Sequence, residues 1–380
     1  MLVTSFPGRG HLNPVLPLAL AARDAGHDVR VASGADQLAH IARYGLEAVE
    51  IGPGLDGLIA DARREHGDAW GDRLFPDAWP RMAVPRLSSF ARTWSPDLVV
   101  SEEEEYAGIL VADLLGVPSV THSWPSPCRP LVDRRQALAA LAPVWRDLAA
   151  GHEPRNLGQT YLDACPPPLQ SPEIRDIDGV IPIRPVSLQE SVDNEPPPWL
   201  EALPRPAVYL TLGTVPVFST PGRLRECIDG LAPLVASLVV TTGPNPVDSL
   251  GRLPQQVRAV TYLTQSAVLP HVDLVVSHGG AGTTLGAIEA GLPHLLLPFE
   301  SQSQVGSAAA LERLGAGITL APDDRSSGRI AAAARQLRED PRHRVASMAV
   351  RASLDELPDP SSVVLRLVEV AGTRRRGGRN

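Results

Sequence analysis

A histidine followed by glycines and threonines stands out in the last third of the chain. The stretch SHGGAGTTLGAIEAGLP, residues 277–293, follows the apolar segment VDLVV and leads into a helix-like sequence. The first turn of a helix offers free backbone N–H groups and a partial positive charge, and both suit a phosphate group. Imidazole and hydroxyl groups add further donors. We therefore expect a diphosphate site formed by His278, Gly280, Ala281, Gly282 and Thr283.

Two other interpretations of this stretch remain open. It could be a glycine-rich turn between a strand and a helix that binds no ligand. It could also belong to a dinucleotide site, but its glycines do not follow the G-x-G-x-x-G spacing. That motif also belongs to the first strand–helix turn rather than to the last third of a chain. The spacing therefore argues against a dinucleotide.

A second histidine, His11, lies in PGRGHLNP, in the turn after the apolar segment LVTSF. A histidine at such a turn is often only a helix cap. Glu102, however, ends the apolar segment PDLVVSE, and the carboxyl ends of parallel strands meet at one edge of a sheet. A carboxylate on one imidazole nitrogen fixes the tautomer and leaves the other nitrogen as a general base. We therefore expect Glu102 to contact His11, and the next three glutamates, 103–105, to form a solvated loop.

Apolar strands and helix-like segments alternate in both halves of the chain, which predicts an α/β fold with parallel, doubly wound sheets. In the first half we expect strands at 2–6, 27–33, 96–102 and 117–123 and helices at 13–26 and 106–116. In the second half we expect strands at 207–214, 234–243, 257–263, 272–280 and 294–300 and helices at 223–234, 283–290 and 305–314.

The chain divides into two domains joined by a proline-rich linker. Residues 1–190 form the first domain and end in the linker, at about 166–206, where CPPPLQSP, IPIRP and NEPPPW indicate a stiff, extended segment. Residues 207–360 form the second domain. For residues 361–380 we expect the end of a helix and then a basic, disordered tail, TRRRGGRN.

The composition fits two globular domains in the cytoplasm. The 380 residues are 43% hydrophobic and carry a net charge of −8, which argues against a nucleic-acid partner. No apolar run reaches the roughly 20 residues that span a bilayer, and the first residues do not resemble a signal peptide. The scattered cysteines, Cys128, Cys165 and Cys227, predict neither disulfides nor a zinc site.

The chain contains no lysine. A Schiff base on lysine and the lysine of a P-loop are therefore excluded. Any phosphate must be bound by backbone N–H groups, hydroxyls, histidine or arginine.

Together these motifs resemble family 1 nucleotide-sugar glycosyltransferases of the GT-B fold, above all the bacterial members that glycosylate antibiotics and other natural products. The resemblance rests on FPGRGHLNPVLPLALAARDAGHDV, the proline-rich linker, TYLTQSAVLPHVDLVVSHGGAGTTL and AGLPHLLLPFESQSQ, and it extends from Leu2 to about Gly317. It implies two Rossmann-like domains facing across a cleft, the first binding the acceptor and the second the nucleotide-sugar donor. It also implies an inverting, metal-independent reaction without a cofactor.

In this resemblance His11 and Glu102 are the catalytic pair. His11 deprotonates an acceptor hydroxyl and Glu102 orients His11. The activated oxygen attacks the anomeric carbon of the sugar, and a nucleoside diphosphate leaves. His278, the amides of residues 280–283, the Thr283 hydroxyl and Thr214 would stabilise the charge that develops on the leaving group.

The residues before the phosphate motif would hold the nucleotide base. Tyr262 stands where the family has a tryptophan, and it can still stack on a pyrimidine. Thr264 and Gln265 replace the family's Pro-Gln pair, so the glutamine is kept. We therefore expect Tyr262, Leu263 and Gln265 to bind the donor.

Gly286 bears on the sugar of the nucleotide. Family members that use UDP-sugars often carry a glutamate here that binds both ribose hydroxyls, and glycine cannot replace it. A deoxyribose lacks the 2′-hydroxyl, and a buried acceptor without a partner costs roughly 1–3 kcal/mol. We therefore favour a dTDP-sugar over a UDP-sugar as donor. The alternative is that Glu289, one helical turn further on, binds the ribose.

The loop PFESQSQ also departs from the family, which has Asp-Gln where it binds sugar hydroxyls. Counting back from residues 315–317 aligns that pair with Ser303 and Gln304, and counting forward from Pro298 aligns it with residues 302–303. We prefer Ser303 and Gln304, because the following helix must keep its register. The carboxylate is lost in both alignments, which suits a sugar with fewer hydroxyls or an amino group, or indicates weak activity.

For the acceptor, a small apolar aglycone, we expect a pocket in the first domain. The candidate residues for its walls are Trp70, Trp79, His122 and Trp124. Each of them could instead be an ordinary core or surface residue.

Several functions compete with deoxysugar transfer from dTDP. A UDP-sugar could be the donor. The missing aspartate would suit a catalytically silent partner of another glycosyltransferase, although His11, Glu102 and His278 are retained. A nucleotide-sugar epimerase would not need the His11–Glu102 pair, and the glycine spacing opposes a NAD-dependent oxidoreductase. We expect a monomer or a homodimer without a membrane span.

Overall fold

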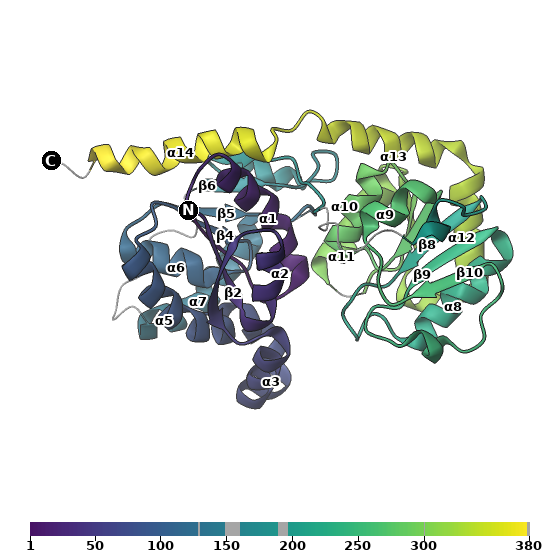
Figure 1. Cartoon of the computed structure of the whole chain (residues 1–380), viewed down its shortest axis with the longest axis horizontal. Helices are drawn as coiled ribbons and strands as arrows, with labels where there is room; N and C mark the ends of the chain where they lie inside the picture. The colour runs from purple at the N-terminus through teal and green to yellow at the C-terminus, as the bar shows by residue number, and fades with distance from the viewer. Residues whose placement is uncertain (128–129, 149–159, 189–196, 300, 378–380) are drawn as a thin grey trace.

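Two parallel β-sheets, one in each half of the chain, organise the protein (Figure 1). The computed structural model describes residues 1–127, 130–148, 160–188, 197–299 and 301–377, and for 130–138, 176 and 373–377 it describes the backbone alone. The expected α/β class with two Rossmann-like domains is confirmed, since helices cover both parallel sheets.

The first sheet has seven strands in the order β3-β2-β1-β4-β5-β6-β7. Its strands are β1 Leu2–Thr4, β2 Arg30–Gly34, β3 Glu47–Gly52, β4 Val99–Glu102, β5 Ser119–His122, β6 Thr160–Asp163 and β7 Val180–Pro182. The strand order reverses between β1 and β4, which are direct neighbours. Ligands of open α/β sheets bind at such a reversal, beyond the carboxyl ends of the strands.

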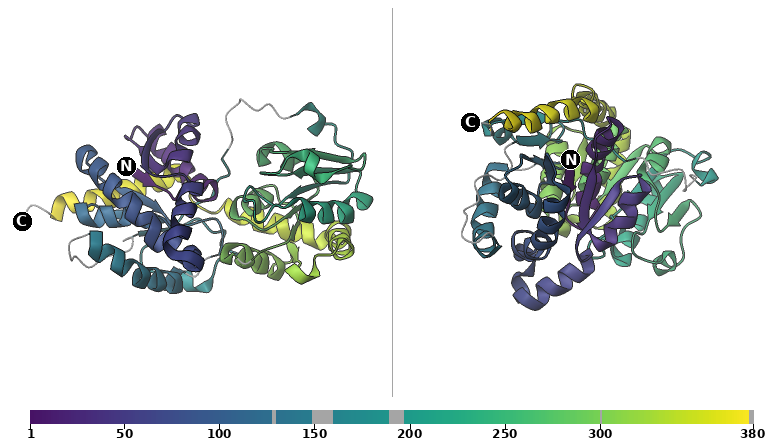
Figure 2. Two further views of the ribbon diagram at one scale, coloured as in Figure 1. Left: turned by 90° about the horizontal axis from the view of Figure 1, so that it is seen from below. Right: turned by 60° about the vertical axis from the view of Figure 1, so that its left-hand side comes forward.

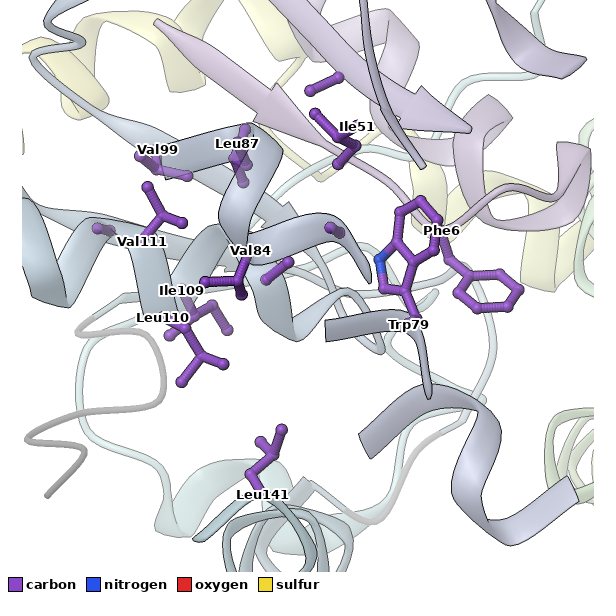
Figure 3. Packing of buried hydrophobic residues seen from close by; sticks show 14 of the residues in the cluster. Phe6, Ile51, Trp79, Val84, Leu87, Val99, Ile109, Leu110, Val111 and Leu141 are labelled. Atoms are coloured by element: carbon purple, nitrogen blue, oxygen red, sulfur yellow. The ribbon is translucent and has the colours of Figure 1, made fainter. Parts of the chain in front are cut away.

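Helices lie on both faces of this sheet. The α-helices of the first domain are α1 Arg9–Asp24, α2 Leu38–Arg43, α3 Leu55–His66, α4 Trp70–Arg73, α5 Trp79–Trp94, α6 Tyr106–Leu115 and α7 Pro130–Leu148. Short 3-10 or π turns are η1 Ala35–Gln37, η2 Gly67–Ala69, η3 Leu74–Ala78 and η4 Pro172–Asp176. Figure 3 shows part of the core between α5, α6 and the sheet, where Trp79 packs beside Phe6.

Helix α1 begins four residues earlier than the sequence predicted. Gly8 is its N-cap in an extended conformation, and the Leu12 N–H donates to the Gly8 carbonyl. His11 therefore lies in the first turn of α1 and not in the turn before it. The helix fixes the direction of the His11 side chain more firmly than a loop would.

The second sheet repeats the pattern with six strands in the order β10-β9-β8-β11-β12-β13. Its strands are β8 Ala207–Thr211, β9 Ser237–Thr241, β10 Val257–Val260, β11 Leu274–Ser277, β12 His294–Leu296 and β13 Gly317–Thr319. Its helices are α8 Pro221–Leu231, α9 Gln265–Val268, α10 Ala281–Glu289, α11 Gln302–Arg313, α12 Ser327–Glu339 and α13 Pro341–Leu354. Its 3-10 turns are η6 Ala232–Leu234, η7 Val247–Leu250, η8 Leu269–His271 and η9 Pro322–Asp324, and one more, η5 Pro198–Leu200, precedes the sheet. Here the order reverses between β8 and β11.

The predicted linker at 166–206 is too long, because β7 lies inside it and pairs with β6. Proline is tolerated at the end of an edge strand, since one side of such a strand needs no ladder hydrogen bonds, and Pro182 ends β7 at the edge of the sheet. The sequence signal of β6 and β7 is weak because both are very short. The passage between the sheets is thus confined to 183–206, of which 189–196 lie outside the described residues.

The last helix, α14 Pro360–Gly377, returns to the first domain, as Figures 1 and 2 show from different sides. Its buried side chains Val363, Val364 and Leu367 pack in the same core cluster as α1. The backbone of α14 runs on through residues 373–377, the first part of the predicted basic tail. Residues 378–380 lie outside the described part of the chain, as does Cys128.

Candidate functional site

His11 and Glu102 meet at the reversal of the first sheet, as the sequence predicted. The Nδ1 atom of His11 lies 3.2 Å from Oε1 of Glu102, and the carboxylate is completely buried. The same Oε1 accepts a hydrogen bond from the Glu104 N–H at 3.0 Å. The His11 ring is 21% exposed, so its Nε2 atom remains for a ligand.

The surroundings of His11 adjust its proton affinity. Burial of the ring opposes the charged form, but the negative charges of Glu102 and Glu104 outweigh it, so the pKa of His11 is raised above its usual value. A raised pKa makes the neutral imidazole a stronger base. The pair is therefore suited to taking a proton from a hydroxyl group.

Three aromatic rings surround His11. The ring centroid of Phe6 lies 5.0 Å from that of His11, Phe75 lies at 5.5 Å, and Trp124 stands edge-on at 4.9 Å. Trp124 was predicted as an acceptor residue and lies beside the base. The sequence reasoning named neither Phe6, which directly precedes PGRGH, nor Phe75, which lies between the predicted acceptor residues Trp70 and Trp79.

Two predicted acceptor residues lie in the protein interior instead of on a pocket wall. Trp79 is completely buried, and its Nε1–H donates to Oε1 of Glu105 at 2.9 Å. His122 is buried at the end of β5, where its ring pairs with the Ser123 carbonyl oxygen and burial lowers its pKa to about 4. Strand and helix packing enclose both side chains. Trp70 is partly exposed on α4, with the Arg63 guanidinium 4.7 Å from its ring.

The expected solvated loop after Glu102 is also wrong. Glu105 is fully buried and caps α6, since its carboxylate accepts hydrogen bonds from the N–H groups of residues 107 and 108. The Glu103 carboxylate accepts from the Tyr161 hydroxyl at 2.7 Å and from the Trp124 N–H at 3.4 Å. These contacts form because the ends of β4, β5 and β6 lie side by side. Glu103 thereby links the Trp124 backbone to the loop that follows Glu102.

The second site lies at the reversal of the second sheet, where α10 begins. Gly280 is the N-cap of α10, and no described side chain caps the helix, so its first N–H groups lack an internal partner there. His278, 8% exposed, precedes this turn, and its buried Nδ1 atom has no hydrogen-bond partner among the described residues. Burial lowers the pKa of His278 to about 4, so the ring is neutral and can donate one N–H.

Two glycines leave the space that the His278 ring occupies. A Cβ atom at Gly213 would lie 2.7 Å from the ring, and one at Gly280 would lie 2.6 Å from it. Gly213 also has φ +81°, a conformation that favours glycine. Phe218 stacks on the outer side, with ring centroids 5.7 Å apart. Thr214, next to Gly213, is exposed in the loop that follows β8.

Thr283 and Gly286 share a neighbour in Gln265. The Gln265 Nε2–H donates to the Thr283 Oγ1 atom at 2.9 Å. A Cβ atom at Gly286 would overlap the Gln265 Oε1 atom, so the glutamine fills the space beside this glycine. Glu289, the alternative ribose ligand, accepts instead from the Ser187 N–H at 3.0 Å, a contact to the segment that joins the two domains.

The remaining predicted donor residues differ in exposure. Tyr262 is 47% exposed, whereas Leu263 is buried in an apolar cluster. The Ser303 hydroxyl lies 3.1 Å from that of Ser301. Gln304 is buried, and its Oε1 accepts from the Phe299 N–H at 2.9 Å, so this side chain holds the loop before α11.

Behind the turn lies a hydrogen-bonded brace that the sequence did not reveal. The Ser277 Oγ atom accepts from the Gly279 N–H at 3.0 Å and lies 2.8 Å from the His294 Nε2 atom. The Ser277 hydroxyl and the His294 ring thus share one hydrogen bond, and burial lowers the pKa of His294 to about 3. This brace fixes Gly279 at φ +80° and with it the turn that carries His278.

The two sites lie on elements that touch each other. Helix α1, which carries His11, contacts α10, whose first turn forms the second site. A Cβ atom on Gly306 of α11 would lie 3.5 Å from the Pro127 carbonyl oxygen, in the segment that follows Trp124. Within the described residues, no group of three or more His, Cys, Asp or Glu side chains could hold a metal ion, and no helix is long and apolar enough to cross a membrane.

Most of the chain matches a known protein family. Residues 71–213 match the N-terminal domain of the erythromycin biosynthesis protein CIII-like family, and residues 225–370 match its C-terminal domain. The chain is 32% identical to the TDP-daunosamine transferase DnrS of Streptomyces peucetius, over 99% of this chain and 97% of the relative.

Solved structures agree. The glycosyltransferase SnogD from Streptomyces nogalater is 30% identical, with a TM-score of 0.81 over 98% of this chain and 99% of its own. The glycosyltransferase VinC, solved in complex with dTDP, is 27% identical, with a TM-score of 0.80 over 97% of this chain and 98% of its own.

Proposed function

Because the chain belongs to the erythromycin biosynthesis protein CIII-like family of bacterial natural-product glycosyltransferases, we propose that it transfers a deoxysugar from a dTDP-sugar to a small, apolar aglycone. The chain is an enzyme of the glycosyltransferase type, and its fold is the GT-B arrangement of two Rossmann-like domains. The observation that carries the proposal is the pairing of His11 on α1 with the buried Glu102 carboxylate at the end of β4, together with the contact between α1 and α10.

The acceptor half of the reaction uses His11. Its Nε2 atom takes the proton of the aglycone hydroxyl, and the oxygen then forms a bond to the anomeric carbon as the bond from that carbon to the diphosphate breaks. Attack from the face opposite the leaving group inverts the anomeric centre. Glu102 stabilises the imidazolium that forms, and the partly exposed rings of Phe75 and Trp124 offer an apolar surface for the aglycone, while the buried Phe6 ring packs against His11.

The donor half of the reaction uses the start of α10. The leaving diphosphate gains negative charge, which the uncapped N–H groups of α10, a neutral His278 N–H and the Thr283 hydroxyl can stabilise. These donors supply the stabilisation that a metal ion supplies elsewhere, so we include metal independence in the proposal. No reaction step needs a further cofactor.

Two observations support dTDP as the nucleotide. DnrS is named a TDP-daunosamine transferase, and VinC was solved with dTDP bound. In this chain, Gly286 brings no carboxylate to the site, Gln265 fills the space beside it, and Glu289 contacts Ser187. A second ribose hydroxyl would therefore lack a charged acceptor from this helix.

Calorimetry with dTDP and UDP tests the nucleotide. We expect clearly tighter binding of dTDP, and tighter binding of UDP would overturn this part of the proposal. Sugar transfer to a panel of hydroxylated aglycones, followed by mass spectrometry, tests the reaction. A protein that binds dTDP but transfers no sugar from any dTDP-deoxysugar would be a silent relative and not a catalyst.

The variant His11→Ala tests the base. It should lower kcat by about 100-fold or more, because a general base contributes roughly 10²–10⁴-fold, and it should leave dTDP binding unchanged. The exposed His27, replaced by alanine, is the matched control. Retained transfer in His11→Ala would show that another group accepts the proton.

A further inference from the structure

We propose that Gln265 is a positioning residue that acts on the donor diphosphate through Thr283, and that Gly286 leaves the space this arrangement requires. The inference rests on the proposed function, because it assumes that the first turn of α10 binds the diphosphate. Gln265 was expected to bind the donor, and Gly286 was interpreted as the absence of a ribose ligand. In this inference both residues serve to position the Thr283 hydroxyl.

The hydrogen bond between Gln265 and Thr283 has a defined direction. The Gln265 Nε2 atom can only donate, so the Thr283 Oγ1 atom accepts at 2.9 Å. The Thr283 hydroxyl makes no other hydrogen bond among the described residues, so its own hydrogen stays available. In the first turn of an uncapped helix, that hydrogen can be donated to a phosphoryl oxygen.

Gly286 lies one helical turn after Thr283, on the same face of α10. A Cβ atom there would overlap the Gln265 Oε1 atom and lie 2.9 Å from Cδ1 of Leu269. A side chain at position 286 and the observed Gln265 conformation therefore exclude each other. Glycine weakens a helix interior, and the packing of Gln265 gives a physical reason for glycine at this position.

Reversing the direction of the Gln265 hydrogen bond separates positioning from packing. In Gln265→Glu the carboxylate has the same shape but can only accept, so it takes the Thr283 hydrogen away from the phosphate. We expect about tenfold weaker dTDP binding for Gln265→Ala, which no longer orients the hydroxyl, and a larger loss for Gln265→Glu. If Gln265 only filled space, Gln265→Glu would lose no more dTDP affinity than the same substitution loses through charge repulsion in a Thr283→Val background.

A double-mutant cycle tests the route through Thr283. In a Thr283→Val background, Gln265→Ala should cause no further loss of dTDP affinity, because the hydroxyl it positions is gone. Gln265→Glu in the same background measures the repulsion between the added charge and the diphosphate. The loss that remains after this correction is due to the reversed hydrogen bond.

Gly286→Ala provides the second arm. It should displace Gln265 and weaken dTDP binding by a factor similar to that of Gln265→Ala, and the double variant should be no worse than either single one. Gly328→Ala, at a helical glycine where a Cβ atom meets nothing within 4 Å, is the matched control. Gln336→Ala, at an exposed glutamine of α12, is the control for loss of an amide. Thermal melting confirms that each variant is folded.

The outcomes separate the two proposals. Additive losses for Gln265→Ala and Thr283→Val, or wild-type affinity of Gln265→Ala, would overturn the role of Gln265 while the wild type still binds dTDP. A wild-type protein that binds neither dTDP nor UDP would overturn the proposed function and this inference with it.

Discussion

Glu102 makes His11 a stronger base, and this effect should be visible in the pH dependence. Because the pKa of His11 is raised, kcat/KM should fall as pH falls through a value above the ordinary 6.5. Glu102→Gln removes the charge that raises the pKa of His11. The acidic limb of the kcat/KM profile should therefore move to lower pH, and kcat should decrease. Glu104→Gln, which removes a more weakly acting charge, should shift the limb less. An unchanged limb in Glu102→Gln would contradict the pairing.

His294 should make the protein sensitive to acid. Its pKa of about 3 keeps it neutral in the native state, whereas the unfolded chain takes up a proton below pH 6.5. The unfolded state then binds more protons, so the free energy of unfolding falls as pH decreases. His294→Gln cannot be protonated and should lose about 2 kcal/mol less than the wild type between pH 7.5 and 5. Urea unfolding at both pH values measures the free energy of unfolding of the two proteins. Equal decreases in wild type and His294→Gln would contradict the prediction.

At the level of single residues, sequence reasoning succeeded where position along a strand decides the contact. His11, Glu102 and His278 follow apolar strands, and strand order brings the first two together. Phe75 and His294 could not be assigned, because their roles depend on side-chain packing between elements distant in sequence. Trp79 and His122 were misassigned, since residue type alone does not distinguish an interior ring from one on a pocket wall.

The loops that follow β8 and β11 together leave space for the His278 ring, because each places a glycine beside it. Gly280→Ala should push the ring away from its place, because the new Cβ atom would lie 2.6 Å from Nε2. We expect dTDP binding more than about tenfold weaker, corresponding to the loss of one charge-assisted hydrogen bond, with little change in melting temperature. Gly222→Ala, where a Cβ atom meets nothing within 4 Å, should bind dTDP normally. Equal affinities of the two variants would show that the ring does not need this space.

Helices and strands were predictable where the pattern is long. Strands β4, β8, β9 and β11 and helix α6 fall within the predicted ranges because apolar runs and terminal glycines mark them, whereas α10 begins two residues before its predicted start at 283. The short strands β6 and β7 gave no such signal among the prolines. The start of α1 depends on Gly8, whose capping role is not visible in an apolar pattern.

The position of α14 makes the stability of the first domain depend on the last residues of the chain. Leu367 is 2% exposed against α1, whereas Leu365 on the same helix is 69% exposed. Leu367→Ala should lower the free energy of unfolding by about 2–5 kcal/mol, as for other buried leucines. Leu365→Ala should change it by less than about 0.5 kcal/mol. Chemical denaturation compares them, and equal effects would mean that α14 does not stabilise the first domain.

For the whole molecule, the restart of the strand–helix pattern near residue 207 was enough to predict two domains. It was not enough to predict which domain α14 covers. The amphipathic pattern of a helix shows that one face must be buried, but not what buries it. Only the structure shows that the chain ends on the domain where it began.

The packing of α14 on the first domain has a consequence for folding during translation. Translation proceeds from the N-terminal end at roughly 5–20 residues per second, so α14 emerges on the order of 10–40 s after β7 completes the first sheet. During this interval the apolar side of α1 that Val363, Val364 and Leu367 later cover is open to solvent and to chaperones. The first domain thus starts folding first and finishes last.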